Sequence, residues 1–174
     1  ACMKASLAAG KIETVNDIDT IADGTAVQTP GDVIFPYVQK YVDEIITVED
    51  EELIVNFLDI IENHKMVVEN SGLLSVAALK HLKCKNKNVV SILSGGDMDI
   101  ITLSSVVQHG LIHRGRIFTI SVQLPDRPGE LVNVASVIAE ANGNVIKLEH
   151  NQFISLNRNA AVELTITMEA YGLE

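Results

Sequence analysis

The sequence predicts an α/β protein in which a parallel sheet flanked by helices is followed by a smaller, ferredoxin-like β-α-β-β unit. Over residues 1–112, short β-branched runs alternate with amphipathic segments, which is the pattern of a parallel sheet with helices packed on it. From residue 113, apolar and polar residues alternate singly, as in an antiparallel strand with one solvated face. We therefore expect two domains, 1–112 and 113–174.

The first domain is expected to open with a helix that ends at Gly10, a residue able to adopt the left-handed conformation. The segment 12–31 is short-chained, polar and glycine-containing, which indicates an irregular loop able to approach a ligand closely. Asp32 is then predicted to cap a helix to Tyr41, with Pro36 tolerated near its first turn.

Three further helices are predicted to alternate with short strands. A periodic helix should run from Asp50 to Asn63, and two more should follow at 71–82 and 99–109, the last closed by Gly110. The strands are expected at 44–48, 66–69 and 88–93.

The second domain is predicted to contain strands at 117–124, near Asn144 and at 162–169. Between the first two, a helix should run from Pro128 to Asn142, with proline at its start and glycine after its end. This order makes up most of a ferredoxin-like unit whose second helix and fourth strand are missing, so we expect the domain to be incomplete at its carboxyl end.

Composition excludes several classes of function. Thirteen basic and twenty-three acidic side chains give a net charge of -10, which disfavours binding to nucleic acid or anionic membranes. No apolar run is long enough to span a bilayer, so we expect a cytoplasmic protein. Cys2 and Cys84 form no metal-type cluster, and Gly110 separates His109 from His113, so we expect no metal site.

Two turns between a predicted strand and a predicted helix are the first candidate sites. In 93–99 (LSGGDMD), two glycines let the backbone approach a ligand while Ser94 offers a hydroxyl; a simple turn without a ligand is the alternative. Glu69 places a carboxylate at the end of a buried strand, where it either faces a ligand or caps the following helix.

Two loops are further candidates. Residues 20–25 (TIADGT) lie in the long polar loop and, taken alone, predict only a turn. In 124–131 (LPDRPGEL), free amides at a helix start could bind a carboxylate, or the segment could serve only as a loop.

In this order, the segments resemble the threonine ammonia-lyase (threonine dehydratase) family of fold type II pyridoxal-phosphate enzymes. The matching segments are DTIADGTAV (19–27), VDEIITVEDEEL (42–53), VVENSGLLSVAAL (67–79) and LSGGDMD (93–99). From Phe118 onward the sequence is similar to an ACT domain, the amino-acid-sensing module that follows the catalytic region in many of these enzymes.

The resemblance implies that Ser94 hydrogen-bonds the pyridine nitrogen of pyridoxal 5'-phosphate and that Glu69 lies near the cofactor ring. It places a loop on the substrate side of the cofactor, while Asp97 departs from the asparagine common in the family. The implied cofactor-binding residues are Ser94, Gly95, Gly96 and Glu69, and the substrate-side loop is Ala22, Asp23 and Gly24.

The family's Schiff-base lysine and its phosphate-binding glycine loop have no counterpart in this sequence, so no residue here is assigned as catalytic and the chain is expected to be inactive alone. The ACT resemblance implies an amino-acid pocket across the interface of a homo-oligomer, a dimer or tetramer, with isoleucine as inhibitor and valine opposing it. The implied effector-binding residues are Asp126, Arg127, Pro128, Gly129, Glu130, Asn142, Gly143 and Asn144.

The function implied is that of the carboxyl-terminal part of a lyase which deaminates L-threonine, and L-serine as a second substrate, to the 2-oxo acid and ammonia. Such an enzyme takes part in amino-acid metabolism and isoleucine biosynthesis under allosteric regulation. The alternatives are a non-catalytic, amino-acid-binding regulatory protein derived from such an enzyme, and a related serine dehydratase or racemase.

Overall fold

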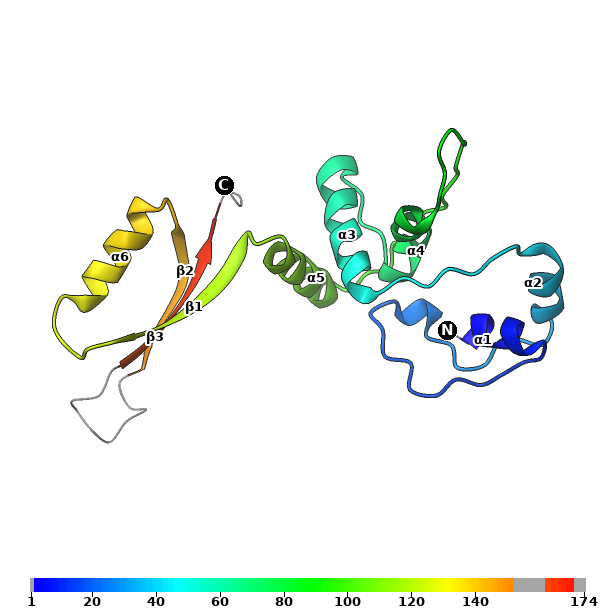
Figure 1. Cartoon of the computed structure of the whole chain (residues 1–174), viewed down its shortest axis with the longest axis horizontal. Coiled ribbons are helices and arrows are strands. Elements are labelled where there is room, and N and C mark those ends of the chain that lie inside the picture. Colours follow the sequence, from blue (N-terminus) through cyan, green and yellow to red (C-terminus); the bar gives the residue numbers. More distant parts are fainter. Residues whose placement is uncertain (1, 152–161, 171–174) are drawn as a thin grey trace. The chain divides into compact units, whose positions relative to one another are not determined.

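The computed structural model describes residues 2–151 and 162–170 (Figure 1). Packing within the chain forms two compact units, Ala1–Val107 and Gln108–Glu174. The assignment of functional domains to 1–112 and 113–174 includes residues 1, 152–161 and 171–174, which lie outside the described residues, and it stays a prediction. No helix in the described part of the chain is long and apolar enough to cross a membrane.

Helices and long irregular segments build the first unit. In chain order the helical elements are α1 (Cys2–Ala9), η1 (Asp23–Thr25), α2 (Phe35–Tyr41), α3 (Asp50–His64), η2 (Asn70–Leu73), α4 (Leu74–Ala77), η3 (Ala78–His81) and α5 (Ile100–His113), where η marks a short 3-10 turn.

Helix α3 is the structural centre of the first unit. It begins with a capping box, in which Glu49 at the N-cap and Glu52 bond each other's backbone amides, and ends at Lys65 in the left-handed conformation. Its apolar residues recur at helical spacing, so one side is buried and Phe57 has no exposed surface. The buried core around it is Ala22, Leu53, Phe57, Ile60, Val68, Leu73, Ala77 and Val106.

The predicted α/β class is confirmed, but the parallel strands are not formed among the described residues. Segments 44–48, 66–69 and 88–93 carry no strand pairing. A parallel strand exists only when a neighbour completes its ladder of hydrogen bonds. Val90 is 89% exposed and Ile92 is 74% exposed, so most of the apolar run 88–93 is uncovered here, whereas Leu93 at its end packs against the core.

Two helix predictions need correction at their boundaries. Helix α2 begins at Phe35 rather than near Asp32, whose carboxylate instead accepts a bond from the amide of Val33. The stretch predicted as one helix over 71–82 consists of the short elements η2, α4 and η3.

The prediction that Gly110 ends a helix is wrong. Helix α5 continues to His113, and the amide of Arg114 donates to the carbonyl of Gly110 over 3.0 Å. The end comes at Gly115, which has the left-handed conformation (φ +66°) that a side chain would disfavour. A glycine inside a helix costs only about 1 kcal/mol, so the apolar turns beside Gly110 outweigh it. His109 and His113 therefore lie on one helix.

The second unit is a three-stranded antiparallel sheet with a helix on one face. Its elements are β1 (Ile117–Leu124), α6 (Glu130–Glu140), β2 (Asn144–Asn151) and β3 (Val162–Glu169), and the strand order is β1-β3-β2 (Figure 1). This confirms the predicted β-α-β-β order, although α6 is shorter than the predicted helix of 128–142.

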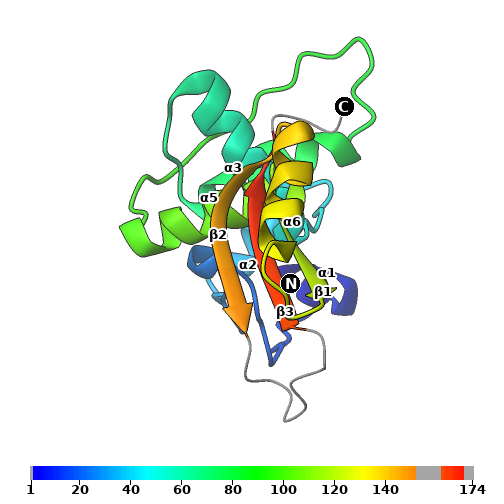
Figure 2. The same ribbon diagram turned by 90° about the vertical axis from the view of Figure 1, so that its left-hand side faces the viewer.

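Alternation along β3 decides which face of this sheet is buried. Its apolar residues alternate with polar ones, and Ile166 pairs with Ile120 on β1 and with Leu148 on β2. Figure 2 shows α6 in front of this face of the sheet. The buried cluster that joins helix and sheet is Ile138, Leu164, Ile166 and Met168.

Candidate functional site

The candidate site of the first unit is built around Glu69. Segment 66–69 leads from buried Val68 into the turn η2, and the carbonyl of Glu69 accepts a 2.9 Å bond from the amide of Gly72. The amide of Glu69 donates to the carbonyl of Gly95 over 3.3 Å. Glu69 is therefore held between the start of η2 and the glycine turn of 94–96.

The Ser94–Gly96 turn lies directly against Glu69. Gly95 has φ +76°, and a Cβ atom there would lie 2.0 Å from the carboxyl carbon of Glu69. On the other side, a Cβ at Gly72 would lie 1.6 Å from the carbonyl oxygen of Ser94. At Gly72 only glycine fits, because the atoms in the way belong to the backbone of Ser94. At Gly95 the Glu69 side chain could shift, and it is the positive φ that favours glycine. Ser94 itself is exposed.

The loop that contains Ala22, Asp23 and Gly24 lies against the same turn. A Cβ at Gly24 would lie 2.7 Å from the hydroxyl oxygen of Ser71, the second residue of η2. The side-chain amide of Asn70 donates to the carbonyl of Ile21 over 3.0 Å. The structure thus brings together three predicted segments, which are the loop of 22–24, Glu69 and the turn of 94–96.

A cavity of about 550 Å³ opens beside Glu69. Its walls come from the loop of 20–23, the turn at 69–70, the segment of 97–99 and helix α5. Of the predicted site residues, Glu69 and Asp23 line it, whereas Ser94, Gly95, Gly96, Ala22 and Gly24 do not. The lining residues are Thr20, Ile21, Asp23, Glu69, Asn70, Asp97, Met98, Asp99, Ile101, Thr102, Ser105 and Val106.

The cavity wall is acidic, since four carboxylates line it and none of its lining residues is basic. Asp99 caps helix α5 by accepting bonds from the amides of Thr102 and Ile101, each over 3.0 Å. The Thr102 amide, together with the Thr102 hydroxyl and the other amides of this helix start, holds the pKa of Asp99 below its usual value. The cavity therefore favours ligand groups that donate hydrogen bonds or carry positive charge.

Two buried polar atoms directly after Glu69 in the chain, Asn70 Oδ1 and Ser71 Oγ, have no hydrogen-bond partner among the residues that the structure describes. Asn70 is 5% exposed. Buried polar groups are normally paired, and an unpaired one costs about 1–3 kcal/mol. Unpaired groups of this kind beside a cavity mark a place where an added polar group would be stabilised.

Asn70 and Asp50 are the parts of the site that the sequence did not indicate. Asp50 accepts bonds from the hydroxyl of Thr20 over 2.6 Å and from the amide of Ile21 over 2.9 Å. The sequence predicts Asp50 only as the start of a helix and gives Asn70 no role in a site. The contacts join residues 29 to 49 positions apart, and local patterns carry no signal for them.

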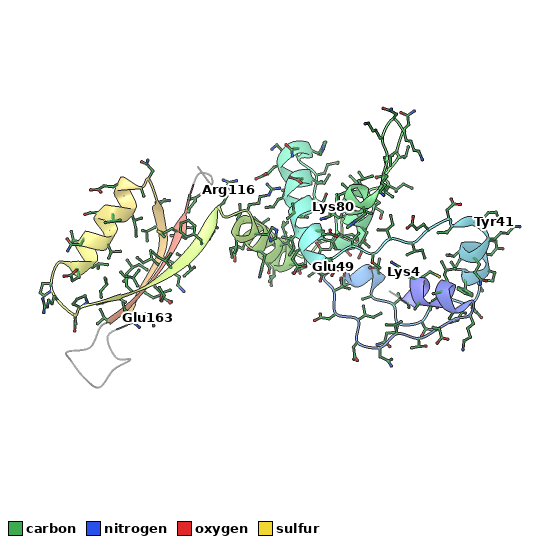
Figure 3. All side chains as sticks on the ribbon, in the orientation of Figure 1. Lys4, Tyr41, Glu49, Lys80, Arg116 and Glu163 are labelled. Atoms are coloured by element: carbon green, nitrogen blue, oxygen red, sulfur yellow. The ribbon has the colours of Figure 1, made fainter. Side chains whose placement is uncertain are left out.

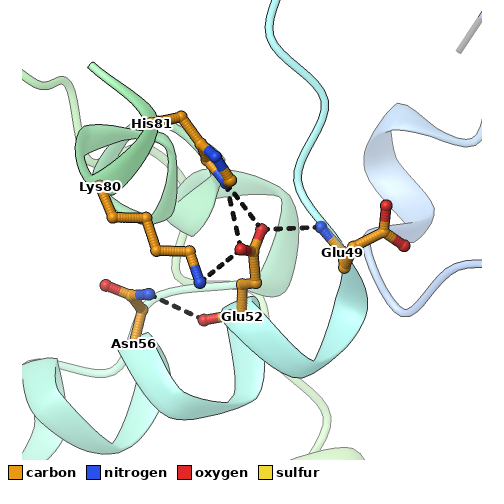
Figure 4. Close-up of polar contacts among 5 residues, drawn as sticks. All are labelled: Glu49, Glu52, Asn56, Lys80 and His81. Carbon is orange, nitrogen blue, oxygen red and sulfur yellow. Dashed lines mark hydrogen bonds and ion pairs between the residues drawn. The ribbon is translucent and has the colours of Figure 1, made fainter. Parts of the chain in front are cut away.

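A charged network fixes the start of α3 to η3 outside the cavity (Figures 3 and 4). Glu52 pairs with Lys80, its carboxylate lies 3.1 Å from His81 Nε2, and it accepts a 3.0 Å bond from the Glu49 amide. The ammonium group of Lys80 is the largest cause that lowers the pKa of Glu52 to about 2. The network therefore links α3, which contributes Leu53, Phe57 and Ile60 to the core, to η3, which directly follows core residue Ala77.

The second unit has a smaller cavity of about 310 Å³ where β1 leads into α6. Gly129 sits at the N-cap with φ +97°, so the loop turns sharply before the helix. The predicted effector residues of 126–130 line this cavity. The other predicted group, Asn142, Gly143 and Asn144, lies at the opposite end of α6 and does not join it within one chain.

The described residues contain no group of three or more His, Cys, Asp or Glu side chains placed to hold a metal ion.

Comparison with known proteins gives one matching family and several relatives. The family described as "Pyridoxal-phosphate dependent enzyme" matches residues 1–95. An L-threonine ammonia-lyase of Thermotoga maritima is 40% identical over 151 residues, which are 86% of this chain and 38% of that protein. One from Geobacter sulfurreducens is 37% identical over 97% of this chain and 42% of that protein. The chain thus spans about two fifths of the length of these two relatives.

Two solved structures are also similar to this chain. The processed form of threonine deaminase isoform 2 from Solanum lycopersicum matches with a TM-score of 0.58 and 30% identity, over 62% of this chain and 33% of that chain. A serine racemase from Dictyostelium discoideum matches with a TM-score of 0.50 and 31% identity, over 57% of this chain and 32% of that chain.

Proposed function

This chain belongs to the family of pyridoxal-phosphate-dependent enzymes, and from that premise we propose that it is the carboxyl-terminal part of a threonine ammonia-lyase. The full-length protein converts L-threonine to 2-oxobutanoate and ammonia by β-elimination, and accepts L-serine as a second substrate. The observation that carries the proposal is the convergence of the loop of 22–24 and the turn of 94–96 on Glu69. The relatives named L-threonine ammonia-lyase support the choice of substrate.

The residues of this turn fit pyridoxal 5'-phosphate. Ser94 is exposed, and among the described residues Ser71 Oγ and Asn70 Oδ1, which follow Glu69 in the chain, are buried without a hydrogen-bond partner. When bound, the cofactor supplies an electron sink for the loss of the α-proton and the β-hydroxyl. The family resemblance places the lysine that binds the cofactor in a part of the enzyme without a counterpart in this sequence, and no lysine among the described residues lines the cavity. We therefore propose that this chain alone is inactive.

Each segment has its own part in the proposed reaction. The Ser94 hydroxyl would donate a hydrogen bond to the ring nitrogen of the bound cofactor without protonating it, which would suit the elimination of a hydroxyl group. Gly95 and Gly96 would form the turn on the cofactor side, and Glu69 would contribute a carboxylate there. Ala22, Asp23 and Gly24 lie on the substrate side, where the loop keeps water from the reacting atoms.

The second unit is proposed as an ACT-type regulatory domain. The cavity at 126–130 places a charged loop beside the start of α6, and free amides at a helix start favour a carboxylate. The enzyme is proposed to be a cytoplasmic homo-oligomer, in which residues 142–144 of a neighbouring subunit complete the effector pocket. Isoleucine bound there inhibits the enzyme, and valine opposes this inhibition. The relative from Geobacter sulfurreducens aligns with 97% of this chain, which supports the view that the two units belong together in one enzyme.

Product analysis tests the proposed function. Full-length protein is incubated with pyridoxal 5'-phosphate and either L-threonine or L-serine, and the products are separated by chromatography. We expect 2-oxobutanoate and ammonia from threonine. D-Serine as the main product would support the racemase alternative, which the match to a serine racemase favours. Amino-acid binding without turnover would support the regulatory-protein alternative.

A further inference from the structure

The loop that forms one wall of the acidic cavity is held from two sides. Its residues Thr20, Ile21 and Asp23 line the cavity, and Ala22 between them is 2% exposed and belongs to the core. Asp50, in the first turn of α3, holds the loop from one side, and Asn70, directly after Glu69, holds it from the other.

Asp50 makes the more extensive of the two contacts. One carboxylate oxygen accepts from the hydroxyl of Thr20 over 2.6 Å, and the other accepts from the amide of Ile21 over 2.9 Å. The Thr20 hydroxyl in turn accepts a 3.2 Å bond from the amide of Ala22. Because the Thr20 hydroxyl donates its proton to Asp50, its lone pairs are free to accept the bond from the Ala22 amide. Asp50 therefore orients the backbone of residues 20–22.

Helix capping does not account for this geometry. The N-cap of α3 is Glu49, which forms the capping box with Glu52. The two oxygens of Asp50 bond side-chain and backbone groups 29 and 30 positions away. Asn70 then bonds the Ile21 carbonyl, so both backbone polar groups of Ile21 are fixed by side chains from different elements.

The geometry points to Asp50 as a positioning residue that fixes the Thr20–Gly24 loop as the substrate-side wall of the cavity beside Glu69. Asp50 is not among the residues that line the cavity, so it acts through Thr20 and Ile21. The inference rests on the proposed function, since a substrate is needed for the wall to matter in catalysis. The contacts themselves exist without substrate.

Kinetics of full-length variants test this role. Asp50→Asn replaces one acceptor by a donor that faces the Ile21 amide or the Thr20 hydroxyl, and Thr20→Val removes the hydroxyl with little change of shape. We expect each to raise the KM for L-threonine about tenfold, with kcat changed less than twofold, because a displaced wall weakens binding of substrate and transition state alike. Thr20→Ser, which keeps the hydroxyl, should restore KM to within about twofold.

The matched control is Glu51→Ala, which removes an exposed carboxylate from the same helical turn. It should leave KM unchanged. Equal KM values for wild type, Asp50→Asn and Thr20→Val would overturn the inference, as would a loss of kcat and thermal stability at constant KM, which indicates a purely structural contact.

A second readout separates this inference from the proposed function. Amide hydrogen exchange at Ile21 and Ala22, measured without substrate, should be at least tenfold faster in Asp50→Asn than in wild type or Glu51→Ala. If wild-type protein does not turn over threonine but exchange accelerates, the proposed function fails while the positioning by Asp50 stands. Unchanged exchange would overturn the positioning by Asp50 whatever the substrate.

Discussion

A Cβ atom at Gly95 would lie 2.0 Å from the carboxyl carbon of Glu69, although the two residues are far apart in the sequence. The backbone of the 94–96 turn therefore packs on the carboxylate itself, and the Glu69 amide bonds the Gly95 carbonyl. This contact is the geometric centre of the candidate site, because the loop of 22–24 also comes close to Glu69, where a Cβ at Gly24 would lie 3.9 Å from Glu69 Oε1.

Gly95→Ala should destabilise the full-length protein. The added methyl group meets Glu69, and φ +76° is unfavourable for any side chain. We expect the free energy of unfolding to fall by about 1–2 kcal/mol, mainly from backbone strain at this φ, because the end of the flexible Glu69 side chain can move away from the methyl group. Urea denaturation measures this change in the free energy of unfolding. The matched control is Gly96→Ala, where the nearest atom is 3.8 Å from the added Cβ; an equal loss in both variants would contradict the account.

Ser94→Ala should lower kcat for threonine in the full-length enzyme. Loss of the proposed hydrogen bond to the ring nitrogen weakens stabilisation of the transition state, and about 1.4 kcal/mol corresponds to a tenfold change in rate. A coupled assay of 2-oxobutanoate gives kcat, and we expect a fall of about tenfold or more. Ser104→Ala on the exposed side of α5 is the control. Unchanged turnover in Ser94→Ala would remove that residue from the site.

Glu52→Gln should destabilise the protein at neutral pH but not in acid. Lys80 and the other partners hold the folded pKa of Glu52 at about 2, below the ordinary value of 4.5. A depressed carboxyl pKa contributes stability above the unfolded value, and that contribution is lost as pH falls from about 4.5 to about 2. Because half-exposed Lys80 is screened by solvent, we expect the free energy of unfolding of Glu52→Gln at neutral pH to be about 1 kcal/mol below that of wild type.

Denaturant unfolding at several pH values checks this prediction, with Glu51→Gln as the exposed control from the same turn. The difference between wild type and Glu52→Gln should shrink as pH falls through that window. A difference independent of pH would mean that the ion pair with Lys80 contributes nothing measurable to stability.

Arg127→Ala should weaken inhibition by isoleucine. Arg127 lines the cavity at the start of α6, and a charge-assisted hydrogen bond to an effector carboxylate contributes about 1.5–3 kcal/mol. The isoleucine concentration that halves the activity should therefore rise about tenfold or more. Lys147→Ala removes a cation that pairs with Glu149 on β2, outside this cavity, and serves as the control. An equal response of both variants to isoleucine would argue against the assigned pocket.

The elements that could be predicted from the sequence are those encoded by local periodicity. Helix α3 follows the spacing of Leu53 and Phe57, and β3 follows the strict alternation from Val162, so both lie close to their predicted positions. The end of α5 could not be predicted from Gly110, because neighbouring apolar residues continue the helix to the stronger stop at Gly115.

Strand pairing depends on contacts that local patterns do not encode. The same is true of the hydrogen bonds from Asp50 and Asn70 that hold the loop of 20–23. Segment 88–93 has the composition of a buried strand, yet it has no ladder among the described residues. Glu69 and Ser94 could be proposed from motifs that resemble a family, whereas Asp50 and Asn70 become visible only through bonds across 29 and 49 residues.

The visible absorption spectrum of the full-length protein, purified without added cofactor, tests the central claim most directly. We expect a band from bound pyridoxal 5'-phosphate that shifts when L-threonine is added, and a smaller shift in Asp50→Asn at the same threonine concentration. If no protein-bound band is seen, even after incubation with the cofactor and removal of the unbound excess by gel filtration, the assignment of the Glu69 and Ser94 turns as a cofactor site is contradicted.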